Sequence, residues 1–161
     1  MKTIVNVDKN WGIGIGNNLL NHLSPDMKFF KEKTTGNVVV MGKSTFLSFP
    51  GQKALPNRVN IVLTTDQSWS APDVIVCHSI EELFIQLERY DTNTVYVIGG
   101  ESVYKQLLPY CNTAYVTKVE TAKEADKFFP DLDKIDEWIL SQDGELLEHN
   151  GVKFKFTTYI K

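Results

Sequence analysis

Residues 94–108 read TVYVIGGESVYKQLL and place a strand, a turn and a helix in one short stretch. The β-branched and aromatic residues before Gly99 predict a buried strand, and adjacent glycines allow a backbone turn that side chains would block. The apolar spacing after Gly100 predicts a helix, which Pro109 would end. A strand that runs directly into a helix is the repeating unit of α/β proteins.

Similar apolar runs recur along the chain, at 3–7, 37–41, 59–64, 73–77, 94–99, 113–119, 138–142 and 152–160. Helical patterns separate many of them, at 24–34, 79–90 and 101–108, with a short helical turn after Gly42. Near-continuous apolar runs in the first half are typical of parallel strands, whereas alternation in 152–160 is typical of a half-exposed strand. We therefore predict an α/β domain with a mostly parallel central sheet and an antiparallel C-terminal end.

Composition narrows the class of protein. A chain of 161 residues with a net charge of −3 is most simply one domain, and it lacks the basic excess of a nucleic-acid-binding protein. No signal-peptide core or membrane span is evident. The two cysteines, Cys77 and Cys111, have no metal-ligand spacing and are too few for a disulfide scaffold. We expect a reduced, cytoplasmic protein that binds no metal, membrane or nucleic acid.

Two glycine motifs resemble nucleotide-binding signatures without matching them. GIGIG (12–16) lacks the third glycine of a dinucleotide fingerprint and has no helix directly after it. VVVMGKST (38–45) lacks the P-loop spacing, because five residues separate Gly36 from Gly42. A strand end followed by Lys43 and two hydroxyl residues still suits a phosphate, and the lysine favours the 2′-phosphate of NADP. A solvated surface lysine is the alternative.

The stretch LLNHLSPDMKFF (19–30) holds the most informative carboxylate. Ser24 as cap and Pro25 at the first position predict a helix start, and helical spacing places Asp26 beside Phe29 and Phe30. Acids favour the first turn of any helix, which explains Asp26 without a function. The alternative is an acid in an apolar pocket that binds a cationic or hydrogen-bond-donating ligand.

Eight stretches, in this order and at these spacings, resemble the dihydrofolate reductase family over nearly the whole chain. They are VDKNWGIG (7–14), LSPDMKFFKEKT (23–34), VVVMGKSTF (38–46), LPNRVNIVLT (55–64), VYVIGGESVY (95–104), AYVTKV (114–119), ADKFFP (125–130) and GVKFKFTTY (151–159).

The resemblance implies a central eight-stranded sheet with four helices, in one domain over 1–161 with an adenosine-binding subdomain at about 37–90. The implied reaction is hydride transfer from NADPH to dihydrofolate, with protonation of the adjacent ring nitrogen, giving tetrahydrofolate for one-carbon and nucleotide metabolism. Dihydrofolate and antifolate inhibitors would be the ligands, and the family makes a monomer the expected state.

The resemblance also assigns residues. Asp26 matches the family's active-site acid and Thr117 its hydroxyl partner, with Asn21 and Leu19 in the same catalytic group. Burial beside Met27 and Phe30 should raise the pKa of Asp26. Arg58 matches the arginine that binds the substrate glutamate. The other substrate contacts implied are Ile4, Val5, Met27, Phe30, Phe49, Leu55, Ile98 and Tyr104.

For the cofactor, the family implies a lid at 14–19, a cis Gly99–Gly100 bond and contact of Asp126 with the lid. Asn6 and Ile13 would lie near the nicotinamide. The implied cofactor residues are Asn6, Ile13, Gly14, Asn17, Gly42, Lys43, Ser44, Thr45, Thr64, Thr65, His78, Ile98, Gly99, Gly100, Glu101, Ser102, Val103 and Tyr104.

The chain departs from the family pattern at several positions. Leu20 and Asn21 replace Pro-Trp, Pro25 directly precedes the acid, Lys43 replaces a common Arg, and Lys127 a usual Thr. Two other functions stay open: an NADPH-linked reductase of a pyrimidine intermediate, and a catalytically silent NADPH-binding module.

Overall fold

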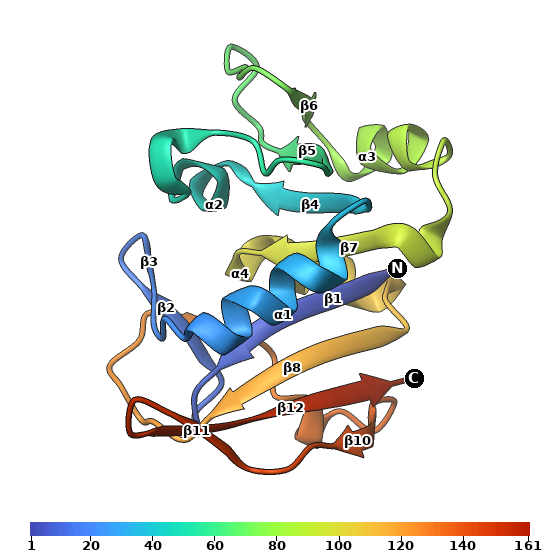
Figure 1. The fold of residues 1–161 in the computed structure, drawn as a ribbon. Helices are drawn as coiled ribbons and strands as arrows, with labels where there is room; N and C mark the ends of the chain where they lie inside the picture. The colour runs from blue at the N-terminus through green and yellow to red at the C-terminus, as the bar shows by residue number, and fades with distance from the viewer.

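A central sheet organises the computed structural model, which describes residues 1–161 (Figure 1). Its strands are β1 (Lys2–Val7), β4 (Val38–Gly42), β5 (Val59–Leu63), β6 (Val74–Cys77), β7 (Val95–Gly99), β8 (Thr113–Val119), β10 (Ile139–Asp143), β11 (Leu147–His149) and β12 (Val152–Ile160). Eight of them follow the order β10-β12-β8-β1-β7-β4-β5-β6, and β11 pairs with β12 beside this path. The strands from β8 to β6 are parallel, whereas β12 runs antiparallel to β8 and β10. The predicted mostly parallel sheet with an antiparallel C-terminal strand is confirmed.

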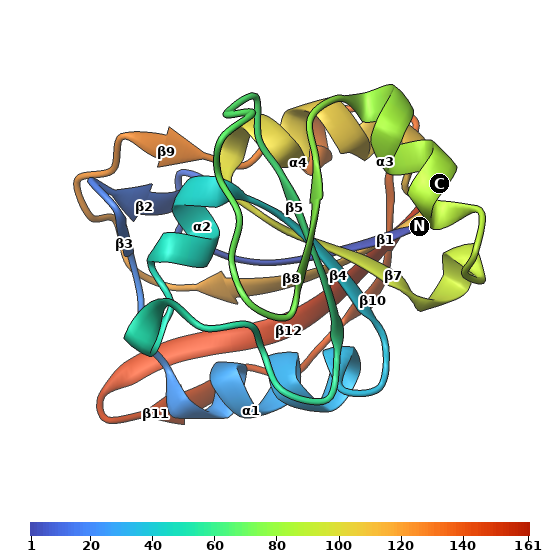
Figure 2. The same cartoon turned by 90° about the horizontal axis from the view of Figure 1, so that it is seen from above.

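Helices cover both faces of this sheet. They are α1 (Ser24–Thr34), α2 (Lys43–Leu47), α3 (Ile80–Leu87) and α4 (Glu101–Leu107). Seen from above, α1 lies on one side of the sheet and α3 and α4 lie on the other (Figure 2). None of the four helices is both long and apolar enough to cross a membrane.

The two faces of the sheet have separate hydrophobic cores, because successive residues of a strand point to opposite sides. In β4, Val38 and Val40 belong to a cluster of 24 buried residues, which includes Leu83 of α3. Val39 and Met41 belong to the second cluster, which lies on the face of α1. This double burial explains why β4 reads as a continuous apolar run.

The glycine-rich segment after β1 is part of a strand. Residues Gly12–Ile15 form strand β2, which pairs antiparallel with β3 (Asn18–Leu19) and with β9 (Lys127–Phe128). At Gly14 an added Cβ would lie 2.9 Å from the carbonyl oxygen of Asn18, so the close approach of the strands favours glycine. The segment is therefore the central strand of a small second sheet.

The expected helix boundaries need two corrections. Leu23 is the N-cap of α1, so Ser24 lies inside the helix and makes no capping bond. Helix α3 begins as predicted, since the Ser79 hydroxyl accepts a hydrogen bond from the Glu82 amide at 3.1 Å, but it ends at Leu87. The Gly99–Gly100 peptide bond is cis, as the resemblance implied.

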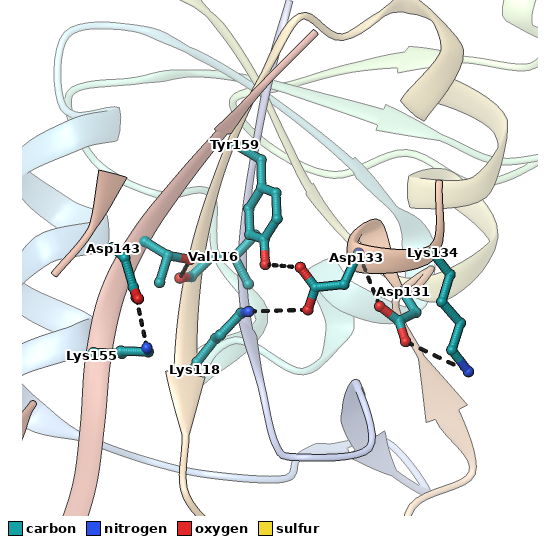
Figure 3. A network of polar contacts seen from close by, with 9 residues as sticks. Val116, Lys118, Asp131, Asp133, Lys134, Asp143, Lys155 and Tyr159 are labelled. Atoms are coloured by element: carbon teal, nitrogen blue, oxygen red, sulfur yellow. Dashed lines mark hydrogen bonds and ion pairs between the residues drawn. The ribbon is translucent and has the colours of Figure 1, made fainter. Parts of the chain in front are cut away.

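A polar network links side chains of β8, β10 and β12 with the segment that precedes β10 (Figure 3). Asp133 accepts hydrogen bonds from the Tyr159 hydroxyl at 2.7 Å and from the Lys118 ammonium at 3.3 Å. Lys155 pairs with Asp143 at 2.6 Å. Because Lys118 follows Thr117 directly in β8, this network and Thr117 lie on opposite faces of the sheet.

Candidate active site

Two adjacent strands bind the carboxylate of Asp26, which lies in the first turn of α1. The Thr117 hydroxyl of β8 donates to Asp26 Oδ1 at 2.6 Å, and the Asn6 amide of β1 donates to Asp26 Oδ2 at 2.9 Å. Asn6 and Thr117 are partners in the parallel register of β1 and β8, so their side chains leave the same face side by side. Each oxygen of the acid thus receives one donor.

The electrostatics of Asp26 are set mainly by burial. Removal of the carboxylate from water raises its pKa, and the hydrogen bonds from Thr117 and Asn6 lower it by less, so the pKa lies above its ordinary value. A carboxylate that is fixed by two hydrogen bonds and has a raised pKa is typical of a group that exchanges hydrogen bonds or protons with a ligand.

Apolar side chains of the α1 face surround this position. Ile4 and Ile98 are buried there, and Phe30, Phe49 and Leu55 pack partly buried against the same cluster. Five of the expected substrate contacts therefore belong to one apolar cluster on the face of the sheet that α1 covers. Tyr104 is buried, and its hydroxyl donates to the Ile4 carbonyl oxygen at 2.8 Å.

Two expected contacts differ from the prediction. Met27 is 58% exposed, so it does not bury Asp26. Val5 belongs to the core on the other face of the sheet, because it alternates with Ile4 and Asn6 along β1. Its side chain is therefore separated from the acid by the sheet itself.

Two hydrogen bonds within the chain hold the Arg58 side chain in place. Its Nε donates to the Pro56 carbonyl oxygen and its Nη1 to the Thr34 hydroxyl, both at 3.0 Å. The guanidinium has five N–H donors, so several remain free for a carboxylate. The position of Arg58 at the C-terminal end of α1 separates it from Asp26 by the length of that helix.

The two residues expected beside the acid have contrasting environments. Leu19 is 58% exposed on β3. Asn21 is 6% exposed; its Oδ1 accepts from the Thr121 hydroxyl at 3.2 Å, while its Nδ2 is buried without a partner. A buried unpaired donor is costly and calls for an explanation, such as a bound water or ligand.

A separate cavity of about 600 Å³ opens where β4 and β7 end and α2 and α4 begin. Glycine allows α2 and α4 to lie close together here. A Cβ added at Gly42 would lie 3.2 Å from Val103, and one added at Gly100 would lie 3.4 Å from Thr45. Ten of the expected cofactor residues line it: Gly42, Lys43, Ser44, Thr64, Thr65, His78, Gly100, Glu101, Ser102 and Val103.

The remaining expected cofactor residues lie outside this cavity: Asn6, Ile13, Gly14, Asn17, Thr45, Ile98, Gly99 and Tyr104. Five further residues that were not expected there also line the cavity: Leu63, Ser79, Ile80, Gln106 and Lys127. Ser79 and Ile80 directly follow His78, and Gln106 lies one helical turn after Ser102. Those two signals could have been read from the sequence, whereas Lys127 comes from β9 and depends on the tertiary fold.

Charged groups within and beside the cavity are mostly paired. Lys43 forms an ion pair with Asp66 at 2.9 Å, and this hydrogen bond lowers the pKa of Asp66 to about 2. The Glu101 carboxylate accepts from the Phe128 backbone amide at 2.6 Å and from Lys105 at 3.2 Å. Lys127 makes no ion pair within 4.0 Å, so its ammonium is free for a ligand.

Asp126 ties the small sheet to the loop before β9. Its carboxylate accepts from the Gly16 amide at 3.1 Å, and its own amide donates to the Gly14 carbonyl oxygen at 3.0 Å. Asp126 therefore contacts the expected lid segment. No group of three or more His, Cys, Asp or Glu side chains is arranged to hold a metal ion.

Comparisons with known proteins agree with this architecture. A family model described as dihydrofolate reductase matches residues 1–161. A dihydrofolate reductase of Staphylococcus haemolyticus is 34% identical over 158 residues, covering 97% of this chain and 92% of the relative. One from Aedes albopictus is 31% identical, covering 98% and 95%. A solved dihydrofolate reductase from Enterococcus faecalis, complexed with NADP(H) and RAB-propyl, has a TM-score of 0.86 and 37% identity, covering 99% of this chain and 94% of that one.

Proposed function

The chain belongs to the dihydrofolate reductase family, an NADPH-dependent oxidoreductase family, and we propose that Asp26 is the acid at which it reduces dihydrofolate to tetrahydrofolate. NADPH supplies the hydride of this reaction, and a proton is added to the adjacent ring nitrogen of the pterin. The observation that carries the proposal is the Asp26 carboxylate, held by Thr117 and Asn6 beside an apolar cluster.

Asp26 would bind the pterin through paired hydrogen bonds. A carboxylate has about four acceptor sites, and two are used by Thr117 and Asn6. The remaining sites can accept a ring N–H and an exocyclic amino group, a bidentate pattern with specific geometry. The apolar side chains of Ile4, Phe30 and Phe49 would exclude water and strengthen those bonds.

Arg58 would bind the carboxylate of the substrate's glutamate. Its contacts with Pro56 and Thr34 fix the plane of the guanidinium, which lowers the entropy cost of bidentate binding. Because Arg58 packs at the far end of α1 from Asp26, the two residues would hold opposite ends of an elongated substrate. Leu55 and Phe49 would contact the part of the substrate between them.

NADPH would bind in the cavity between the ends of β4 and β7. Its 2′-phosphate would lie near Lys43, Ser44 and Thr65, and its pyrophosphate at the start of α4, where backbone amides and the helix dipole favour anions. Lys43 would exchange its contact with Asp66 for the phosphate, at least in part, since both are anions.

The small sheet would act as the lid of the reaction site. Leu19 and Asn17 lie on and beside β3, and Asp126 would hold this sheet closed through Gly16. We further propose that residues 37–90 form the adenosine-binding subdomain of the single domain. The chain would work as a monomer in the cytoplasm, where the buried free thiols of Cys77 and Cys111 would stay reduced.

Oxidation of NADPH by the purified chain, followed by absorbance with and without dihydrofolate, tests the proposed function. The proposal is supported if oxidation depends on dihydrofolate, is fast with NADPH and is slow with NADH. This result would support both the role of Asp26 and the phosphate site at Lys43. Saturable NADPH binding without turnover would instead support a silent module. Turnover of a pyrimidine substrate but not of dihydrofolate would indicate the related pyrimidine reductase.

A further inference from the structure

Asn6 is the fifth of the six residues of β1, and its neighbours Ile4, Val5 and Val7 are apolar and buried. The resemblance suggested a position near the nicotinamide for Asn6. In the structure its Nδ2 donates to Asp26 Oδ2 at 2.9 Å, so the side chain also contacts the acid. Its register partner Thr117 binds the other oxygen at 2.6 Å.

These two contacts fix the carboxylate from both sides. One donor alone would leave the carboxylate free to rotate about its bond to Cβ. Two donors on neighbouring strands, one for each oxygen, define the plane of the group. One acceptor site then remains on each oxygen, which matches a ligand that presents two parallel N–H donors.

We propose that Asn6 is a positioning residue for Asp26, whose amide fixes the orientation of the carboxylate and leaves one acceptor site on each oxygen for the substrate ring. The inference rests on the proposed role of Asp26 in the reaction. It adds a second determinant of the acid's geometry, on β1, to the hydroxyl on β8.

The environment of Asn6 favours this role over a purely structural one. A side chain that only filled space between Ile4 and the acid would be apolar, because an amide beside an apolar cluster loses its hydration. The Nδ2 end is satisfied by Asp26, while Oδ1 accepts no hydrogen bond within the chain and is not sealed from solvent. The amide therefore binds the acid through Nδ2, while solvent can reach its Oδ1.

The titration of Asp26 can report the contact, since no second charge faces the group. The side chains against it are the Asn6 amide of β1, the Thr117 hydroxyl of β8 and the Tyr104 phenol of α4. Burial raises the pKa of Tyr104 above its ordinary value, so the phenol stays neutral near pH 7. The bond from Asn6 stabilises the charged carboxylate and lowers the pKa of Asp26.

The test compares the parent with Asn6→Leu, which keeps a similar size but has no donor, and with Asn6→Gln, which keeps an amide. The pKa of Asp26 is measured in the ligand-free protein by carbon-13 NMR of the aspartate carboxyls, with Asp26→Asn to assign the signal. Loss of one bond to a charged group predicts an upward shift of about one pKa unit in Asn6→Leu. The inflection of kcat/KM for dihydrofolate against pH should rise by the same amount, and Asn6→Gln should restore part of both shifts.

Asn93→Ala is the matched control, because Asn93 is exposed on the loop before β7 and should leave both titrations unchanged. An unchanged Asp26 pKa in Asn6→Leu would overturn the inference. If the pKa of Asp26 shifts but the pH profile of kcat/KM does not, Asn6 has no positioning role in catalysis. Turnover by Asp26→Asn would then show whether the proposed catalytic role of Asp26 has failed as well. If Asn6→Leu does not fold, Asn6→Ala provides the same comparison.

Discussion

The unpaired amide of Asn21 gives a quantitative prediction about stability and activity. Asn21 is buried, its Nδ2 has no partner, and its Oδ1 accepts one bond from Thr121 at 3.2 Å. A buried unpaired donor costs about 1–3 kcal/mol, and a neutral hydrogen bond contributes about 0.5–1.5 kcal/mol. Asn21→Leu removes both, so the free energy of unfolding should rise by about 1 kcal/mol.

The assay is urea unfolding at pH 7 followed by circular dichroism, with a thermal scan. For a domain of this size, 1 kcal/mol corresponds to a rise in Tm of about 2–4 °C. Turnover of dihydrofolate should fall, because the variant loses a free buried donor that a bound ligand would satisfy. Thr121→Val is the control, since it removes only the satisfied bond and should lower stability. A less stable Asn21→Leu would refute the reasoning, because it would mean that Nδ2 has a stabilising partner.

Three further predictions concern charge. Lys43→Ala should reduce the preference for NADPH over NADH by about tenfold, the effect of one charge-assisted phosphate contact, as measured by the ratio of kcat/KM for the two cofactors; an unchanged ratio would leave Lys43 as a surface charge. Lys127→Thr should raise the Kd for NADPH a few-fold and weaken its salt dependence, as titrated by fluorescence, and a Kd equal to that of the parent would remove Lys127 from the cofactor site. Burial raises the folded-state pKa of Asp26 above the ordinary 3.8, so the folded chain binds more protons and stability falls as pH rises through the window above 3.8. Asp26→Asn should therefore have a higher Tm than the parent at pH 7 and no advantage well below pH 3.8, and equal Tm values at pH 7 would contradict a buried, destabilising charge.

Much of the fold followed from local patterns. Buried parallel strands such as β4 read as unbroken apolar runs, and the capped start of α3 was visible in Ser79 and Glu82. The sheet of β2, β3 and β9 was not predictable in the same way. Its strands have two to four residues, and β9 joins β2 from more than a hundred positions away, so no local period marks them.

The residues of the candidate site also fall into two groups, those that the local sequence reveals and those that depend on the tertiary fold. Asp26 stood out because a carboxylate shared a helix face with phenylalanines, and Lys43 because it followed a strand end. The contact of Asn6 depends on the register of β1 with β8, which is set only when the sheet forms. Met27 is one residue from Asp26, yet it is exposed, because a rotation of 100° per residue turns its side chain away from the sheet.

The most direct test of the central claim is steady-state turnover of dihydrofolate by Asp26→Asn at neutral pH, with NADPH binding measured on the same preparation. The carboxylate lies against β1 and β8, whereas the cofactor cavity lies at the ends of β4 and β7, so the two properties should separate. We predict that turnover falls by about a hundredfold or more while the affinity for NADPH is unchanged. Equal turnover in the variant and the parent would contradict the role of Asp26 as the acid of this reductase.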